Sequence, residues 1–134
     1  MQTGIRYLAE NDTYKVYSLC ESVYLKRKAT SQNLDDFEES DSLVAWHYGD
    51  PTAAIILGSN AYVIVAGCGI TVYDVNRHLE MGFLNSADDI WWTDGLHQGF
   101  EDDGIECRFV SFFDTDKLRV FKINAVTKEV TMLP

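Results

Sequence analysis

Hydrophobic positions along this chain recur mostly with the period of two that is typical of strands half-buried in a sheet. Ten short runs are apolar throughout or alternate apolar with polar residues, and they are rich in the Val, Ile, Tyr and Phe that suit a pleated surface. The runs are residues 14–19, 22–25, 43–48, 52–57, 61–66, 70–75, 79–84, 105–113, 118–123 and 129–133. The pattern therefore predicts a protein built mainly of β-strands.

The segments between these runs carry residues that favour tight turns. Gly49-Asp50-Pro51, Gly58-Ser59-Asn60 and Gly67-Cys68-Gly69 each separate two of the predicted strands. Spacings of about 8–12 residues with short turns indicate antiparallel hairpins rather than parallel strands joined by helices. We therefore expect one mainly β domain, residues 1–134, formed by a meander of antiparallel hairpins as a sandwich or a propeller-like partial barrel.

Two short segments have features of helices, so we expect one or two short helices in this domain. Residues 31–39 begin with a capping serine, and several acids suited to the first turn of a helix follow it. Residues 86–93 match the Ser-x-x-Asp capping pattern and stop before Gly95. Both are too short to be stable without packing, and the second could equally be a strand.

Three of the predicted strands share the form apolar-x-Val-aromatic-x-apolar. They are residues 14–19, 70–75 and 118–123, and the last two begin 48 residues apart. Each is followed by turn-prone residues and another strand-like run, so these segments resemble the strand-turn-strand halves of β-propeller blades, whose repeat is about 45 residues. The alternative is that all three are ordinary hairpin strands. Because 134 residues hold fewer than three such repeats and propellers typically have four or more blades, we expect no complete propeller.

Charge is distributed unevenly along the chain, which has 11 Lys and Arg against 21 Asp and Glu and a net charge of -10. Residues 29–107 hold fifteen acids and a single base, Arg77, whereas residues 1–28 and 108–134 each hold five bases and three acids. This surplus argues against a protein that grips nucleic acid, which requires clustered cations. It favours a basic protein partner, because carboxylates steer a cationic protein and speed its association.

The acid-rich segment also holds large aromatic side chains, which dominate the energetics of many protein interfaces. Residues 85–106 contain Trp91, Trp92 and Phe100 beside seven acids, with no Lys or Arg. The alternative is that one tryptophan lies in the core and that the acids only solvate a loop. We predict a partner-binding surface formed by Trp91, Trp92, Asp88, Asp89, Asp94, Glu101, Asp102 and Asp103.

The common catalytic and metal-binding motifs that we sought do not occur. The sequence has no Gly-x-Ser-x-Gly, no phosphate-binding Gly-x-x-x-x-Gly-Lys-Ser/Thr, no His-Glu-x-x-His and no calcium-binding EF-hand loop. Cys20, Cys68 and Cys107 are odd in number and widely spaced, so they indicate neither a disulfide framework nor a zinc site. We expect no enzyme, no cofactor and no resident metal. The alternative is a small metal-dependent hydrolase that uses Asp94, His97 and Glu101.

In size, acidity and lack of a catalytic motif, the chain resembles the immunity proteins, or antitoxins, that mask bacterial nuclease toxins. A toxin that grips RNA or DNA presents cations at its cleft, and an acidic surface with aromatic anchors would complement them. We therefore predict a non-enzymatic inhibitor of a basic, nuclease-type protein, without direct contact to nucleic acid or membrane. A second alternative is a structural or adaptor β domain that works in an assembly.

The same sequence predicts a cytoplasmic location. The first twenty residues hold no apolar stretch of the kind found in secretory signals. The longest apolar segment, residues 52–70, is interrupted by Gly58-Ser59-Asn60 and so is divided into pieces too short to cross a bilayer.

Overall fold

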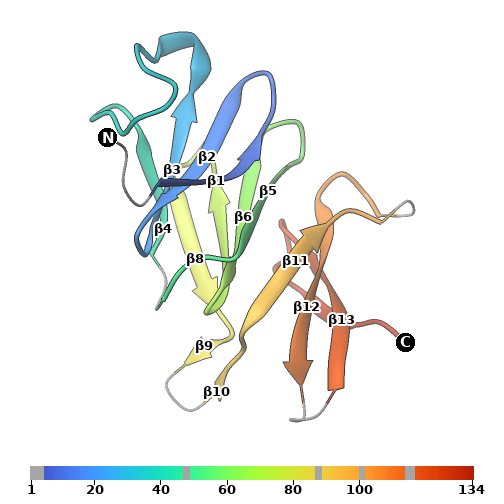
Figure 1. Ribbon diagram of the computed structural model, residues 1–134. Coiled ribbons are helices and arrows are strands. Elements are labelled where there is room, and N and C mark those ends of the chain that lie inside the picture. Colours follow the sequence, from blue (N-terminus) through green and yellow to red (C-terminus); the bar gives the residue numbers. More distant parts are fainter. Residues whose placement is uncertain (1–4, 47–48, 87–88, 100–101, 114–116) are drawn as a thin grey trace.

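The computed structural model describes residues 5–46, 49–86, 89–99, 102–113 and 117–134, which form three four-stranded antiparallel sheets (Figure 1). Sheet 1 contains β1 (Ile5–Glu10), β2 (Tyr14–Leu19), β3 (Ser22–Arg27) and β4 (Ser42–Trp46). Sheet 2 contains β5 (Ala53–Leu57), β6 (Tyr62–Gly67), β7 (Gly69–Asp74) and β8 (Leu79–Phe83). Sheet 3 contains β11 (Thr93–His97), β12 (Glu106–Phe113), β13 (Lys117–Asn124) and β14 (Val130–Met132). Between sheets 2 and 3 the chain forms a small ribbon of β9 (Asn85–Ser86) and β10 (Asp89–Ile90), and one 3-10 turn, η1 (Lys28–Thr30), follows β3.

The mainly β fold expected from the hydrophobic period is confirmed. The predicted strand over residues 14–19 coincides with β2, and each of the other nine predicted runs overlaps one strand. Strands that are neighbours in each four-stranded sheet are consecutive in sequence, so each of these sheets is a meander. The period did not identify β1, β9, β10 or β11. A break in register interrupts the pairing of both β1 and β11, and such bulges disturb the alternation on which the prediction depends.

Sheet 2 lies between the other two sheets (Figure 1), and its strands β6 and β7 are buried on both faces, whereas Leu79 and Met81 of its edge strand β8 are exposed. In β6, Val63 and Val65 belong to the hydrophobic cluster shared with sheet 1, whereas Ile64 and Ala66 belong to the cluster shared with sheet 3. Successive side chains of a strand point to opposite faces, so this one strand supplies both cores. All four of these residues are completely buried.

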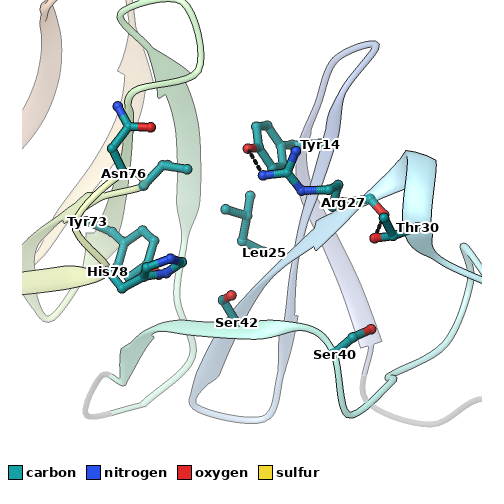
Figure 2. Close-up of a pocket in the computed structure, with 10 residues that line it drawn as sticks. Tyr14, Leu25, Arg27, Thr30, Ser40, Ser42, Tyr73, Asn76 and His78 are labelled. Carbon is teal, nitrogen blue, oxygen red and sulfur yellow. Dashed lines mark hydrogen bonds between the residues drawn. The ribbon is translucent and has the colours of Figure 1, made fainter.

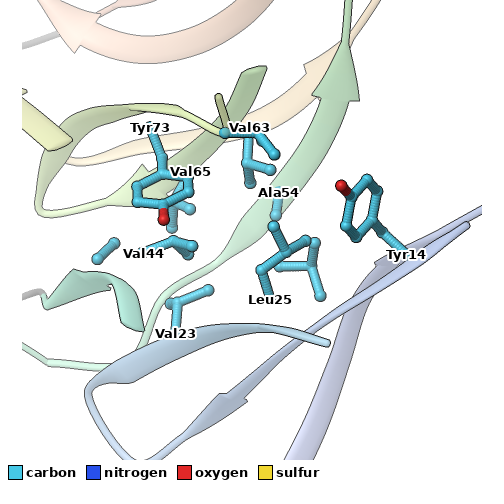
Figure 3. Packing of buried hydrophobic residues seen from close by; sticks show 11 residues of the cluster. Tyr14, Val23, Leu25, Val44, Ala54, Val63, Val65 and Tyr73 are labelled. Atoms are coloured by element: carbon cyan, nitrogen blue, oxygen red, sulfur yellow. The ribbon is translucent and has the colours of Figure 1, made fainter. Parts of the chain in front are cut away.

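Each core is closed by complementary strands of the outer sheets. Figure 3 shows the first core, where Val23 and Leu25 of β3 face the valines of β6 and Tyr14 of β2 lies at its margin. In the second core Phe109 of β12 and Phe121 of β13 stack with their ring centroids 5.4 Å apart. The two faces of sheet 2 thus determine which faces of sheets 1 and 3 point inward.

The arrangement of the three sheets is propeller-like. The first strands lie together, because β5 contacts both β1 and β11. Four-stranded meanders that pack face to face with their first strands adjacent are arranged like successive blades of a β-propeller. The sheets begin at Ile5, Ala53 and Thr93. The third sheet therefore follows sooner than the repeat of about 45 residues requires.

The helix expected over residues 31–39 does not form. The segment runs as turns and bends, because short polar side chains accept the backbone N–H groups that a helix would use. Asn33 Oδ1 accepts from the N–H of Asp35 at 2.9 Å, and Asp41 Oδ2 accepts from the N–H of Glu38 at 3.1 Å. This segment, residues 31–41, lies instead as a covering loop on sheet 1.

The second expected helix, over residues 86–93, is not formed either. Ser86 lies in β9, Asp89 and Ile90 form β10, and Thr93 begins β11, while residues 87 and 88 lie outside the described residues. The described part of this segment is therefore largely extended, as the alternative interpretation held. No helix in the described part of the chain is long and apolar enough to cross a membrane.

Replacing Ile64 with alanine tests the two-faced burial of sheet 2. Ile64 is completely buried, so Ile64→Ala should lower the free energy of unfolding by about 2–5 kcal/mol through lost burial and the cavity that remains. Leu79→Ala is the matched control, because Leu79 is 61% exposed and its loss should change the free energy by less than about 0.5 kcal/mol. Urea unfolding followed by tryptophan fluorescence measures both. Equal losses in the two variants would contradict the layered core.

Candidate functional site

The two tryptophans of the predicted partner-binding surface have different environments. Trp91 belongs to the core between sheets 2 and 3, where its ring centroid lies 5.0 Å from that of Phe121. Trp92 is 60% exposed, and its backbone forms an isolated bridge with Cys68. The hydroxyl of Ser111 donates to the carbonyl of Trp92 at 2.8 Å and holds this backbone to sheet 3. Of the two rings, Trp92 is the one placed to meet a partner.

The predicted acids are separated along β11. Asp94 is exposed beside Trp92, and its carboxylate accepts from the N–H of Gly95 at 2.7 Å. Asp103 is exposed in the loop that follows β11. Because β11 is five residues long, the start and end of this strand are roughly 15 Å apart. Of the remaining predicted acids, Asp89 lies in β10, and Asp88 and Glu101 lie outside the described residues.

Asp102 faces inward, toward the outer surface of sheet 3. Its side chain is 0% exposed and forms ion pairs with Arg108 at 3.0 Å and with Lys122 at 3.4 Å. The hydrogen bond from Arg108 holds the pKa of Asp102 below its ordinary value, although burial acts in the opposite direction. The N–H of Gly99 also donates to this carboxylate at 2.7 Å. Residue 99 has no room for a side chain, because a Cβ there would lie 2.5 Å from Cζ of Arg108. Asp102 therefore anchors its own loop segment and Gly99 to the sheet.

Two of the three residues in the metal-hydrolase alternative are described. His97 is exposed, with Nδ1 2.8 Å from the carbonyl oxygen of Gly95, and Asp94 is engaged with the backbone of the same glycine. Glu101 lies outside the described residues. Within the described ranges, no group of three or more His, Cys, Asp or Glu side chains is placed to hold a metal ion.

Folding brings acids of the middle segment to bases of the two ends. Lys15 pairs with Asp35 at 3.2 Å, and Glu106 accepts Lys122 at 3.7 Å in addition to the pairs of Asp102. The division of charge along the sequence is therefore partly neutralised in space. Among the middle-segment acids whose exposure the structure describes, those that remain exposed are Asp35, Asp36, Glu39, Asp50, Glu80, Asp94 and Asp103.

The outer face of sheet 1, which points away from sheet 2, carries a row of large side chains that sequence reasoning missed. The register places Tyr7 opposite Tyr17, Tyr17 opposite Tyr24, and Tyr24 opposite Leu43. Directly opposed residues of antiparallel strands share one face, so the row crosses all four strands. Tyr17 and Tyr24 stack with their ring centroids 5.5 Å apart.

Part of this outer face remains exposed. Tyr7 is 53% exposed, Leu43 48% and Trp46 56%. Trp46 shares the face because its pairing partner in β3 lies two residues before Tyr24. Phe37, from residues 31–41, lies edge-on against Tyr24 with a centroid distance of 5.0 Å and is 42% exposed. We refer to Tyr7, Phe37, Leu43 and Trp46 as the apolar patch.

A buried ion cluster fixes residues 31–41 beside the apolar patch. Lys26 has a side chain 0% exposed and forms ion pairs with Glu38 at 2.8 Å and with Asp41 at 3.0 Å. Burial alone would lower the pKa of Lys26, but the hydrogen bonds to the two carboxylates outweigh it and the pKa is raised. The hydroxyl of Tyr17 donates to Asp41 at 2.6 Å, and burial together with this bond raises the pKa of Tyr17. These groups position the loop as a fixed border.

That border is acidic. The side chain of Asp35 is 81% exposed, and Asp36 and Glu39 are exposed as well. The neighbouring cations, Lys15 and Lys26, are buried, and both are ion-paired to acids of the loop. A protein that approaches this side of the molecule meets carboxylates and apolar side chains before it meets any of these ammonium groups.

Asp102→Asn and Asp103→Asn form a matched pair that tests the inward role of Asp102. Loss of the buried charge leaves Arg108 and Lys122 without their shared partner, so Asp102→Asn should lower the free energy of unfolding by about 2–4 kcal/mol at pH 7. The exposed Asp103 should contribute less than about 0.5 kcal/mol. Urea unfolding of both variants, with the wild type as reference, is the measurement. A loss in Asp103→Asn as large as that in Asp102→Asn would overturn the assignment.

The same variants should also differ in how their free energy of unfolding depends on pH. Because the folded pKa of Asp102 is lowered from 3.8, the unfolded chain binds the proton more readily. The stabilisation by the Asp102 carboxylate is therefore present above the unfolded pKa and is lost as the pH falls through the lower folded pKa. Unfolding measured between about pH 7 and pH 2 should therefore depend less steeply on pH in Asp102→Asn than in the wild type or Asp103→Asn. Equal slopes in the acidic range would contradict this role.

Comparison with known proteins identifies no relative: no protein-family model, no curated protein and no solved structure matches this chain.

Proposed function

We propose that this chain is a non-enzymatic binding protein that neutralises a basic protein partner, most concretely an immunity protein or antitoxin that blocks a nuclease-type toxin. The observation that carries the proposal is the apolar patch with its acidic border. Exposed aromatic side chains supply large contact area, and carboxylates around them select a cationic surface. The net charge of -10 adds a long-range attraction for the same class of partner.

The backing of the apolar patch favours tight binding. Tyr17 is buried and stacked on Tyr24, and the Lys26 cluster holds the loop that presents Phe37. Side chains that are already fixed in the free protein lose less conformational freedom when a partner binds. Each exposed ring of the patch retains apolar area that a partner can still cover, at roughly 25 cal/mol per Å² of area removed from water.

The acidic border also provides a means of inhibition. A nuclease must hold phosphates with cations at its cleft. Carboxylates placed over those cations occupy the positions that the phosphates of the substrate need. At physiological salt the charges act over about 8 Å, so acids within a strand or two of the apolar patch act on a partner that contacts the patch.

A second contact at Trp92 and Asp94 stays a prediction. Both side chains are exposed, and one residue, the buried Thr93, separates them in sequence. They belong to the start of sheet 3, whereas the apolar patch belongs to sheet 1 on the other side of sheet 2 (Figure 1). Separate variants of the two regions can therefore distinguish them.

The direct test is co-expression with the C-terminal domain of a secreted protein encoded immediately upstream of this chain. Such a domain is expected to be basic and to arrest growth when it is expressed alone. Co-expression should restore growth and give a purified one-to-one complex whose nuclease activity is blocked. A gene neighbourhood without such a domain, or growth arrest that co-expression leaves unchanged, would overturn the immunity function.

Variants of the apolar patch test where the partner binds. Trp46→Ala should weaken the complex by about 2 kcal/mol, or roughly 30-fold, mainly through faster dissociation. Asp36→Asn with Glu39→Gln should slow association and flatten its dependence on salt, because charges at an interface rim act mainly on the association rate. Biosensor kinetics at several ionic strengths separate the two effects.

The matched control is the double variant Trp92→Ala with Asp94→Asn, which changes the predicted second contact by the same chemistry. Thermal unfolding of every variant verifies that each remains folded. The apolar patch is the main contact if its variants weaken binding more than the control does. A weaker complex in the control, with binding unchanged in the patch variants, would assign the interface to Trp92 and Asp94 instead.

A further inference from the structure

A polar pocket of about 270 Å³ lies between sheets 1 and 2, away from the apolar patch. In Figure 2 one wall is formed by β2, β3 and β4 of sheet 1, by η1, and by Ser40 of the loop that precedes β4. The opposite wall is formed by β7 and the turn that follows it. Pockets for drug-sized ligands are typically about 300–1,000 Å³, so this one suits a smaller molecule. Its lining residues are Tyr14, Leu25, Arg27, Thr30, Ser40, Ser42, Tyr73, Val75, Asn76 and His78.

Arg27 supplies the permanent positive charge of this pocket. Its guanidinium donates to the hydroxyl of Tyr14 at 3.0 Å, and Cζ lies 5.2 Å from the centroid of the same ring. These contacts orient the guanidinium without neutralising it, and among the described residues Arg27 forms no ion pair. By contrast Lys15, Lys26 and Lys28 in the same sheet and its 3-10 turn are each ion-paired. The charge of Arg27 is therefore available to a ligand.

The opposite wall presents a chain of hydrogen bonds that ends at His78. Burial raises the pKa of Tyr73 and outweighs the hydrogen bond from Ser42, which lowers it. Tyr73 therefore keeps its proton and can donate it toward Nδ1 of His78, which lies 3.0 Å from the tyrosine oxygen. Donation to Nδ1 leaves the hydrogen of a neutral imidazole on Nε2. In the tautomer that accepts this bond, His78 presents an N–H donor to a ligand.

The turn that carries His78 is held in place by Asp74. The carboxylate of Asp74 accepts from the N–H groups of Asn76 and Arg77, both at 3.1 Å, and forms an ion pair with Arg77 at 3.8 Å. Its negative charge is thus already engaged by the backbone of the turn and by Arg77. Glu80, the other acid that acts on Tyr73, is exposed and does not line the pocket.

Among the residues that the structure describes, no carboxylate lines this pocket, in a chain with 21 acids. Its polar lining consists of one guanidinium, one imidazole, the hydroxyls of Thr30, Ser40 and Ser42, two tyrosine hydroxyls and one amide. These groups come from β2, β3, η1, β4 and β7 and from two connecting segments, and can approach a ligand from several directions. A set of donors arranged in three dimensions suits a tetrahedral oxyanion better than a planar carboxylate, and Arg recognises phosphate oxygens with two parallel hydrogen bonds.

We propose that this pocket binds a small tetrahedral oxyanion, either inorganic phosphate or a phosphate monoester, between Arg27 on sheet 1 and His78 on sheet 2. The ligand would tie the two sheets together at the margin of their shared core. This site is independent of the proposed partner-binding function, because Arg27 and His78 do not belong to the apolar patch.

The test is isothermal titration calorimetry of the full chain with inorganic phosphate and, in a second arm, with glycerol 3-phosphate. Chloride keeps the ionic strength constant, and acetate is the planar-anion probe. Phosphate should bind at one saturable site and acetate should bind at least about tenfold more weakly. A glycerol 3-phosphate affinity equal to or above that of phosphate identifies a monoester site, and a tenfold weaker one identifies a site for the free ion.

Arg27→Gln should lower the affinity for phosphate by about tenfold or more, because it removes a charge-assisted pair of hydrogen bonds. Arg119→Gln is the matched control: Arg119 lies in β13 of sheet 3 and does not line this pocket, and its loss should change the affinity by less than about twofold. His78→Gln should weaken binding without abolishing it. An absence of saturable heat, equal binding of acetate, or an Arg27→Gln protein that binds phosphate as the wild type does would each overturn the proposal.

Discussion

Burial of both faces of sheet 2 is the constraint on which the rest of this structure depends. The alternating residues of β6 are apolar on each side, so sheet 2 is stable only when one sheet covers Val63 and Val65 and another covers Ile64 and Ala66. This requirement sets the order of the three sheets. It also determines that sheets 1 and 3 each turn one face toward sheet 2 and the other toward solvent. The apolar patch lies on the solvent-facing side of sheet 1, and the polar pocket lies between sheets 1 and 2.

The two outward faces are covered in the same way. On sheet 1 the buried Lys26 binds Glu38 and Asp41 of a covering loop, and on sheet 3 the buried Asp102 of a loop binds Arg108 and Lys122. A buried ion that loses its partner is costly, so each cluster restricts the position of its loop. The two outward faces differ in what their loops leave uncovered, because on sheet 1 the loop leaves the apolar patch exposed and borders it with the carboxylates of Asp35, Asp36 and Glu39. Part of the surplus acidity of the sequence is thereby exposed beside the apolar patch.

The strands of this fold were predictable because burial imposes a period of two, as in residues 14–19. Two features that interrupt this period were not predictable: the bulges of β1 and β11, and the left-handed backbone of Gly95 within β11. The expected helix at residues 31–39 was wrong because capping residues such as Asn33 and Asp41 satisfy turns as readily as helix starts.

The candidate site was less predictable than the fold, because it depends on register between strands. Nothing in the sequence places Tyr7 opposite Tyr17 or brings Lys26 to Asp41, and a shift of one residue would exchange the two faces of the sheet. The sequence likewise could not separate Trp91, which packs in the core, from Trp92, which is exposed. The one available signal for this face was that Tyr17 and Tyr24 lie in two neighbouring predicted strands.

The central claim is that the outer face of sheet 1 receives the basic partner. Hydrogen–deuterium exchange of this chain, free and bound to the basic domain with which it forms a complex, measures that claim directly by locating the backbone that binding protects. The account predicts protection in β1, in β4 and in residues 31–41, with exchange across residues 91–99 unchanged. Protection confined to residues 91–99, with sheet 1 exchanging as it does in the free protein, would contradict it.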